Sequence, residues 1–91
     1  MLIVAQHDVH DPGFWPVAAS AQLPDTFRLL QVVPSADGKH GVCLWDAPSV
    51  EALRDFVQTG VGHLSHNDFF AIDEAHAVGI PTREAGEATH D

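Results

Sequence analysis

Seven histidines in a chain of 91 residues are the first candidates for chemistry. Four of them form two pairs with the same spacing, because His7 and His10 lie three positions apart, as do His63 and His66. Imidazole is a ligand for nickel, zinc and copper, and a closed metal site needs three or four converging ligands. These four residues are therefore the candidate metal ligands, with nickel or zinc as the ion. The alternative is that they are solvated histidines with acidic neighbours, since spacing alone is a weak metal signal.

A second hypothesis gives His7 a catalytic role. The pKa of a histidine lies close to working pH, so His7 could act as a general base or polarise a substrate oxygen. Glu74 and His76 are expected on the last strand, which would lie beside the first strand that carries His7. The three side chains are thus candidate catalytic residues that could meet in a shared cleft. The alternative is a histidine bonded only to a backbone carbonyl at the mouth of its strand.

Large apolar side chains could line a cavity for a small hydrophobic ligand. The candidates are Trp45 and Cys43 on the most apolar predicted strand and Phe70 on the last one. Cys43 is the only thiol and has no basic neighbour in the sequence, so we expect a buried structural cysteine and not a nucleophile. The alternative for the aromatic residues is a plain core role, which is the usual one for rings on core faces.

The composition excludes several classes of function. Thirteen acidic and four basic residues give a formal net charge of -9, which repels nucleic acid. One cysteine cannot form an internal disulfide, and the short apolar opening without a basic region predicts neither a signal peptide nor a membrane span. We therefore expect a cytoplasmic protein without nucleic-acid or membrane partners.

Hydrophobic periodicity and turn residues divide the chain into six elements. We expect one domain over residues 1–80 and a loose polar tail over residues 81–91. The predicted strands cover residues 2–9, 27–33, 42–45 and 68–76, the predicted helices cover residues 14–22 and 49–60, and residues 34–41 form a hairpin loop with a turn at Asp37-Gly38.

The stretch of residues 41–58 organises the rest, since a buried strand runs there directly into an amphipathic helix. Ser49 is expected to cap this helix, and Glu51 lies favourably in its first turn. The residues expected on the buried face are Val50, Leu53, Phe56 and Val57. For the first helix, Asp11 is the expected cap. In the second strand, Leu29 and Val33 are expected to share a face.

The predicted order β-α-β-β-α-β is that of a ferredoxin-like α+β fold, an antiparallel sheet with two helices on one face. Its strands are apolar on both faces, so the face without helices should not meet water. A second copy packing sheet to sheet would cover it. We therefore expect a homodimeric α/β barrel with an enclosed space between the two sheets.

The central stretch also resembles a family of small bacterial ferredoxin-like proteins, one of them nickel-binding. The likeness covers residues 27–62, and the residues that carry it are Cys43, Trp45, Ala47, Pro48, Glu51 and Arg54. This family looks to carry histidines in its second strand and second helix, whereas this chain has Leu30–Gln31 and Phe56 there. The resemblance thus implies the fold, and the metal function does not carry over by position.

The expected topology is similar to that of dimeric α/β-barrel proteins, which include cofactor-independent monooxygenases and isomerases and haem- or chlorite-handling proteins. Topology does not assign a function. Three hypotheses follow. The first is a protein that binds a small apolar molecule or a metal ion in the barrel, and the second is a cofactor-independent monooxygenase or isomerase acting on a small hydrophobic substrate. The third is a module whose only role is association.

Overall fold

The structure is a computed structural model that describes residues 1–81 of the chain. In chain order its elements are the strand β1 (Leu2–Val9), the helix α1 (Phe14–Ala19), the strands β2 (Arg28–Pro34) and β3 (His40–Asp46), the helix α2 (Val50–Val61) and the strand β4 (Ser65–Ala71). The predicted α+β class, with a four-stranded antiparallel sheet and two helices, is confirmed. The predicted tail falls almost entirely outside the described residues.

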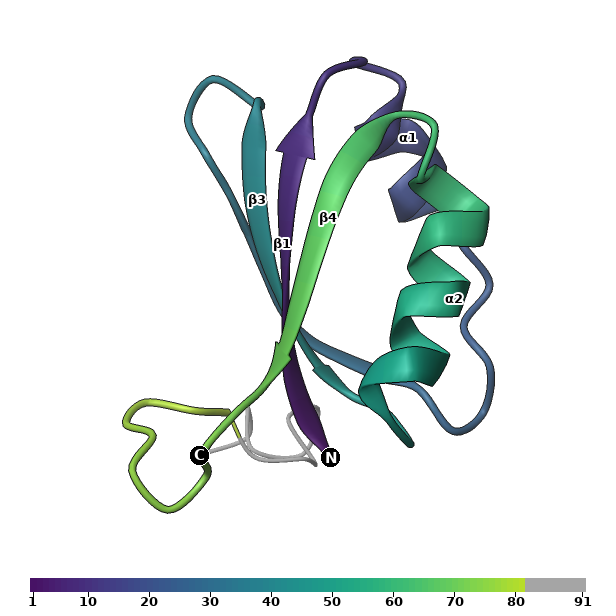
Figure 1. The fold of residues 1–91 in the computed structure, drawn as a ribbon. Helices are drawn as coiled ribbons and strands as arrows, with labels where there is room; N and C mark the ends of the chain where they lie inside the picture. Colours follow the sequence, from purple (N-terminus) through teal and green to yellow (C-terminus); the bar gives the residue numbers. More distant parts are fainter. Residues whose placement is uncertain (82–91) are drawn as a thin grey trace, which may run out of the picture.

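The four strands form one sheet in the order β2-β3-β1-β4. Strand β1 is central and pairs antiparallel with β3 on one side and β4 on the other. Both helices lie over the same side of the sheet (Figure 1). We call this side the helix face and the opposite side the open face.

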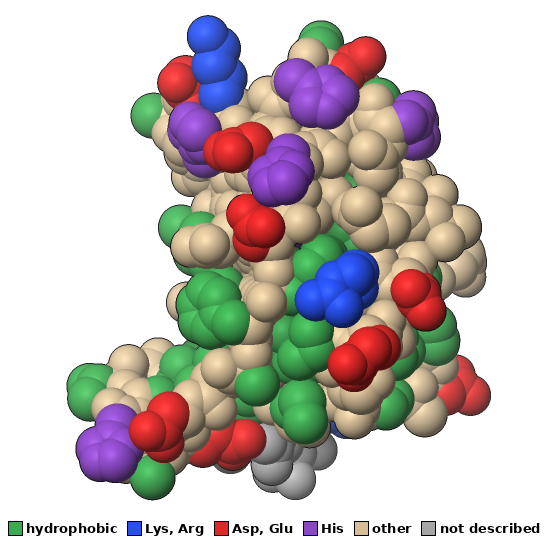
Figure 2. Space-filling view, in the orientation of Figure 1, with side chains coloured by type: hydrophobic (Ala, Val, Ile, Leu, Met, Phe, Trp, Pro, Cys, Tyr) green, Lys and Arg blue, Asp and Glu red, His purple; other side chains and the backbone are tan. Residues whose placement is uncertain are grey.

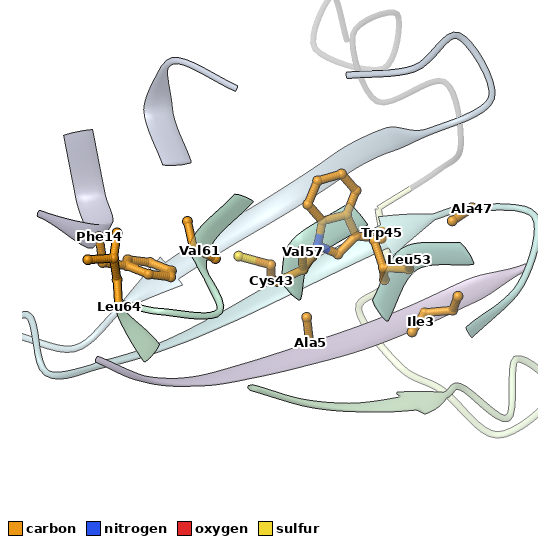
Figure 3. Close-up of a cluster of buried hydrophobic side chains, with 10 residues drawn as sticks. All are labelled: Ile3, Ala5, Phe14, Cys43, Trp45, Ala47, Leu53, Val57, Val61 and Leu64. Carbon is orange, nitrogen blue, oxygen red and sulfur yellow. The ribbon is translucent and has the colours of Figure 1, made fainter. Parts of the chain in front are cut away.

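The core lies between the sheet and α2. Side chains alternate along a strand, so Ile3 and Ala5 of β1 point to the helix face while Leu2 and Val4 point to the open face. The buried cluster on the helix face consists of Ile3, Ala5, Phe14, Cys43, Trp45, Ala47, Leu53, Val57, Val61 and Leu64 (Figure 3).

Helix α2 follows the sequence prediction closely. The Ser49 side chain accepts a hydrogen bond from the Ala52 amide at 3.0 Å, which satisfies one of the free N–H groups of the first turn. Glu51 lies in that turn. The four residues predicted to face inward all pack against the core, namely Val50, Leu53, Phe56 and Val57.

Helix α1 is shorter than predicted. It ends at Ala19, not Gln22, and its N-cap is Gly13, not Asp11. Asp11 instead accepts a hydrogen bond from the Gly13 amide at 2.8 Å, which makes a turn before the helix. At the other end of α1, the Ser20 hydroxyl donates a hydrogen bond to the Val17 carbonyl at 3.0 Å. This side-chain bond takes the place of the backbone hydrogen bond that a longer helix would make to Val17. The chain from Ala21 to Phe27 forms neither helix nor strand.

Two strand predictions were also wrong. A register shift between Leu29 and Gln31 inserts one extra residue into β2, so Val33 pairs with Val42 and faces the side opposite to Leu29. Strand β4 begins at Ser65 and ends at Ala71, earlier than predicted.

A side-chain turn explains the early end of β4. The Asp73 carboxylate accepts a hydrogen bond from the Ala75 amide at 3.1 Å and contacts His76 Nδ1 at 2.8 Å, which folds the chain away from the sheet. Glu74 and His76 therefore lie in this turn and not on the last strand. The Asp37-Gly38 turn between β2 and β3 is present as predicted, with Gly38 at φ +75°.

Candidate functional site

A cleft of about 820 Å³ opens between the helix face of the sheet and the two helices. Its floor includes His7 of β1 together with Cys43 and Trp45 of β3. One wall is α2, which contributes Phe56 and Val57. In Figure 3, Val57 of α2 lies beside Cys43 and Trp45 of β3. The opposite wall is formed by residues 17–23, which comprise the end of α1 and the segment after it.

The cleft exists because α1 is too short to cover its share of the sheet. A six-residue helix is roughly 9 Å long, whereas a seven-residue strand such as β3 extends roughly 23 Å. The end of α1 and the segment after it carry small side chains, namely Ala18, Ala19 and Ala21. These side chains lack the volume to fill the space beside β2 and β3. A volume near 820 Å³ lies within the range of small-molecule sites in proteins.

His7 is buried at one end of the floor, with 5% of its surface exposed. Its Nδ1 lies 2.6 Å from Asn67 Oδ1 on β4, and its ring packs against the Phe14 ring at 5.2 Å between centroids. Burial lowers the pKa of His7 below its ordinary value, and the hydrogen bond with Asn67 opposes this only in part. The imidazole is therefore neutral at pH 7.

The amide of Asn67 sets the tautomer of His7. Its Nδ2 donates to Gln58 Oε1 at 2.6 Å and to the Ser65 carbonyl at 3.3 Å, so its oxygen faces the imidazole. An oxygen acceptor requires that His7 Nδ1 carry the proton. Nε2 then keeps its lone pair, and this nitrogen can accept a hydrogen bond or a proton.

Trp45 has an unusual polar atom. The residue is 6% exposed, and its indole Nε1 is fully buried with no hydrogen-bond acceptor among residues 1–81. A buried donor without a partner costs on the order of 1–3 kcal/mol. The Trp45 ring itself lies edge-on to Phe56, with 6.2 Å between centroids. The cleft therefore has an aromatic wall at this end, whereas the indole N–H has no exposed surface.

Cys43 contributes apolar surface between these two ends. Burial raises the pKa of its thiol to about 11, so the thiol stays protonated at physiological pH. The protonated thiol agrees with the predicted structural role of Cys43, which is then not a nucleophile at the cleft floor. Among the described residues that line the cleft, only Asp55 carries a formal charge at pH 7.

Of the predicted catalytic residues, only His7 lies at this cleft. His76 is bound to Asp73 with 85% of its side chain exposed, and Glu74 is its exposed neighbour in the turn after β4. Of the predicted cavity residues, Trp45 and Cys43 line the cleft, whereas Phe70 is 49% exposed on the open face. Side chains alternate along β4, so Phe70, which pairs with Val4, lies on the face of the sheet opposite to Trp45 and Cys43.

The four candidate metal ligands do not come together. His7 is on the helix face, while His66 is on the open face, 3.3 Å from Asp68. Figure 2 shows histidine and acidic side chains gathered where β1 ends and β4 begins, but these are exposed. Within residues 1–81, no group of three or more His, Cys, Asp or Glu side chains is arranged to hold a metal ion. The nickel or zinc site stays a prediction.

Sequence reasoning missed Asn67 and the wall formed by residues 17–23. Asn67 lies just before the predicted last strand, in the polar run from Ser65 to Asp68. These four residues show no alternation of apolar and polar types, so the sequence carries no signal that marks them as a strand. A second hollow, of about 450 Å³, lies at the N-terminus, where the Met1 amine is already paired with Asp46 at 2.9 Å.

In comparisons with protein-family models, curated proteins and solved structures, nothing matched the chain. Within the part of the chain that the structure describes, no helix is long and apolar enough to cross a membrane.

Proposed function

We propose that this protein binds a small apolar molecule in the cleft between the helix face and the helices. The observation that carries the proposal is the cleft, whose walls are mainly alanine, valine, leucine and aromatic side chains with a few polar atoms at the floor. Because the cleft is open, its apolar side chains contact water when no ligand is bound. An apolar ligand would displace this water and gain the free energy of burying its own surface and that of the cleft walls.

The test is a titration with N-phenyl-1-naphthylamine, an uncharged dye that fluoresces more strongly in apolar surroundings. Two substitutions on adjacent residues of β3 form a matched pair. Cys43→Phe fills the floor of the cleft, whereas Val42→Phe adds the same side chain on the open face. We expect the wild type and Val42→Phe to bind the dye and Cys43→Phe to lose at least about tenfold in affinity, since overfilling a site blocks its occupant.

The same two variants also distinguish between two locations of the ligand. If the ligand lies in a space between the sheets of two copies, Val42→Phe would block the dye and Cys43→Phe would not. That result, or a wild type that does not bind the dye, would contradict the proposal. Circular dichroism of both variants controls for folding.

A second candidate function is catalysis by His7. The observation that favours it is a neutral, oriented imidazole at the cleft floor, which is the state that a general base requires. A cofactor-independent isomerase or monooxygenase on a small hydrophobic substrate would use this group. In D₂O, the enzyme should then speed exchange of the α-protons of 2-tetralone, and His7→Gln should abolish this while still binding the dye.

For the fold, we propose the ferredoxin-like class and a homodimer. The strand order and the position of both helices on one face support the class. Large apolar residues on the open face support the dimer, because Val33, Val42 and Phe70 are 51%, 39% and 49% exposed there. Such clustered apolar surface is typical of an association site. Two open faces that pack on each other would remove it from water.

A further inference from the structure

The distribution of charge around the cleft points to the chemical class of the ligand. The floor is apolar or uncharged, whereas the rim on α2 carries the Asp55 carboxylate, the only formal charge among the described residues that line the cleft. We infer that the ligand is an amphipathic amine, whose apolar body lies on the floor and whose ammonium group lies at the rim beside Asp55. This inference rests on the proposed function and adds the ligand's charge to it.

Asp55 is accessible, and its carboxylate has no partner within residues 1–81. The side chain is exposed on α2, and neither an ion pair nor a hydrogen bond in this part of the chain involves it. The carboxylate is therefore available to a cation on a bound molecule. An ammonium group at the rim also keeps part of its hydration, so it avoids the large desolvation cost of a fully buried charge.

The other polar side chains of the rim can accept hydrogen bonds from the same ammonium group. Thr59 lies four positions after Asp55, so the two side chains share one side of α2. Ser20 and Gln22 are exposed on the opposite wall of the cleft. Hydroxyl and amide oxygens are acceptors, and a primary ammonium group has three N–H donors. The rim thus offers acceptors on both sides of the opening.

The basic residues lie elsewhere, which disfavours an acidic ligand. None of the described lysine and arginine residues lines the cleft. Arg54 is next to Asp55 in the sequence, but its guanidinium lies 5.6 Å from the centre of the Phe69 ring on β4, and Phe69 does not line the cleft. The His7 imidazole is neutral, and the net charge of -9 repels anions. A cation is therefore favoured over a carboxylate such as that of a fatty acid.

The test compares three naphthalene derivatives that share a ring and nearly the same length but differ in charge. At pH 7, 2-(1-naphthyl)ethylamine is positive, 2-(1-naphthyl)ethanol is neutral and 1-naphthylacetate is negative. Displacement of N-phenyl-1-naphthylamine measures their affinities. We expect the wild type to bind the amine about threefold more tightly than the alcohol, the usual effect of an exposed ion pair, and to bind the acetate most weakly.

Two variants of α2 separate the rim carboxylate from the net charge. Asp55→Asn and Glu51→Gln each remove one negative charge from an exposed position of the helix, but Glu51 does not line the cleft. The preference for the amine over the alcohol should disappear in Asp55→Asn and should stay about threefold in Glu51→Gln. A preference that survives Asp55→Asn would overturn the assignment of the ammonium group to this rim.

A second readout concerns the orientation of the bound amine and needs no variant. In a methyl-labelled protein, the methylene protons beside the nitrogen should show NOEs to the Thr59 methyl group. The ring protons should show NOEs to the methyl groups of Val57, which is buried at the cleft. The reverse pattern would place the ammonium group at the floor and would overturn the inference.

The outcomes distinguish the ligand class from the proposed function. Equal affinity of the wild type for amine and alcohol, or tighter binding of the acetate, would overturn the amine. If Cys43→Phe blocks these molecules as well, the apolar binding function stands. Absence of binding by all three derivatives and by the dye would overturn both proposals.

Discussion

At the scale of single residues, the chemistry of His7 follows from its burial. Burial lowers its pKa, so the folded state holds fewer protons than the unfolded state at mildly acidic pH. Stability is then complete above the unfolded pKa of about 6.5 and is lost as pH falls from there toward the lower folded value. We expect urea unfolding at pH 8 and at pH 5.5 to show a larger loss for the wild type than for His7→Gln. Equal losses would contradict the assigned state of His7.

Cys43 provides a second residue-scale prediction. With its thiol pKa near 11, only about one molecule in a thousand carries the thiolate at pH 8, and the side chain is 8% exposed. The reagent DTNB should therefore not label the folded protein over minutes and should label one thiol per chain in 6 M guanidinium. Rapid labelling of the folded protein would show an accessible, activated cysteine.

At the scale of elements, the cap of α2 is the most direct test of local structure. Ser49→Ala removes the acceptor for the Ala52 amide and should lower the free energy of unfolding by about 1 kcal/mol. Thr59→Ala, an exposed change in the same helix, should cause no loss. Guanidinium denaturation of both variants measures the difference. A similar effect of the two substitutions would mean that the cap contributes nothing specific.

Elements with strong local signals were predictable, and those decided by side-chain turns were not. Helix α2 has both a cap residue and a helical repeat of apolar residues, so its position and buried face followed from the sequence. Helix α1 was overestimated because Ser20 ends it through its own side chain, and β4 was displaced by the turn at Asp73. The bulge in β2 was not predictable from the residue types of that strand.

The part of the candidate site that depends on strand alternation was predictable from the sequence. Strand alternation predicts that Trp45 and Cys43 share one face of their strand, and both of them line the cleft together with His7. The side of the sheet on which the cleft opens was not foreseen, because it depends on the length of α1.

At the scale of the whole molecule, the open face should mediate association of two copies. Phe70→Asp places a charge among its apolar residues and should shift the protein to monomer in sedimentation velocity. Val78→Asp is the control, since it adds the same charge at a residue that is 94% exposed in the chain after β4. A wild type that sediments as a monomer would remove the dimer and leave the cleft of the single chain unaffected.

The location of an apolar ligand is the central claim, and intermolecular NOEs test it most directly. With N-phenyl-1-naphthylamine bound to methyl-labelled protein, ring protons of the dye should show NOEs to the methyl groups of Val57 and Val61, which line the cleft. NOEs to Val33 and Val42 on the open face, without any to the α2 valines, would contradict the account.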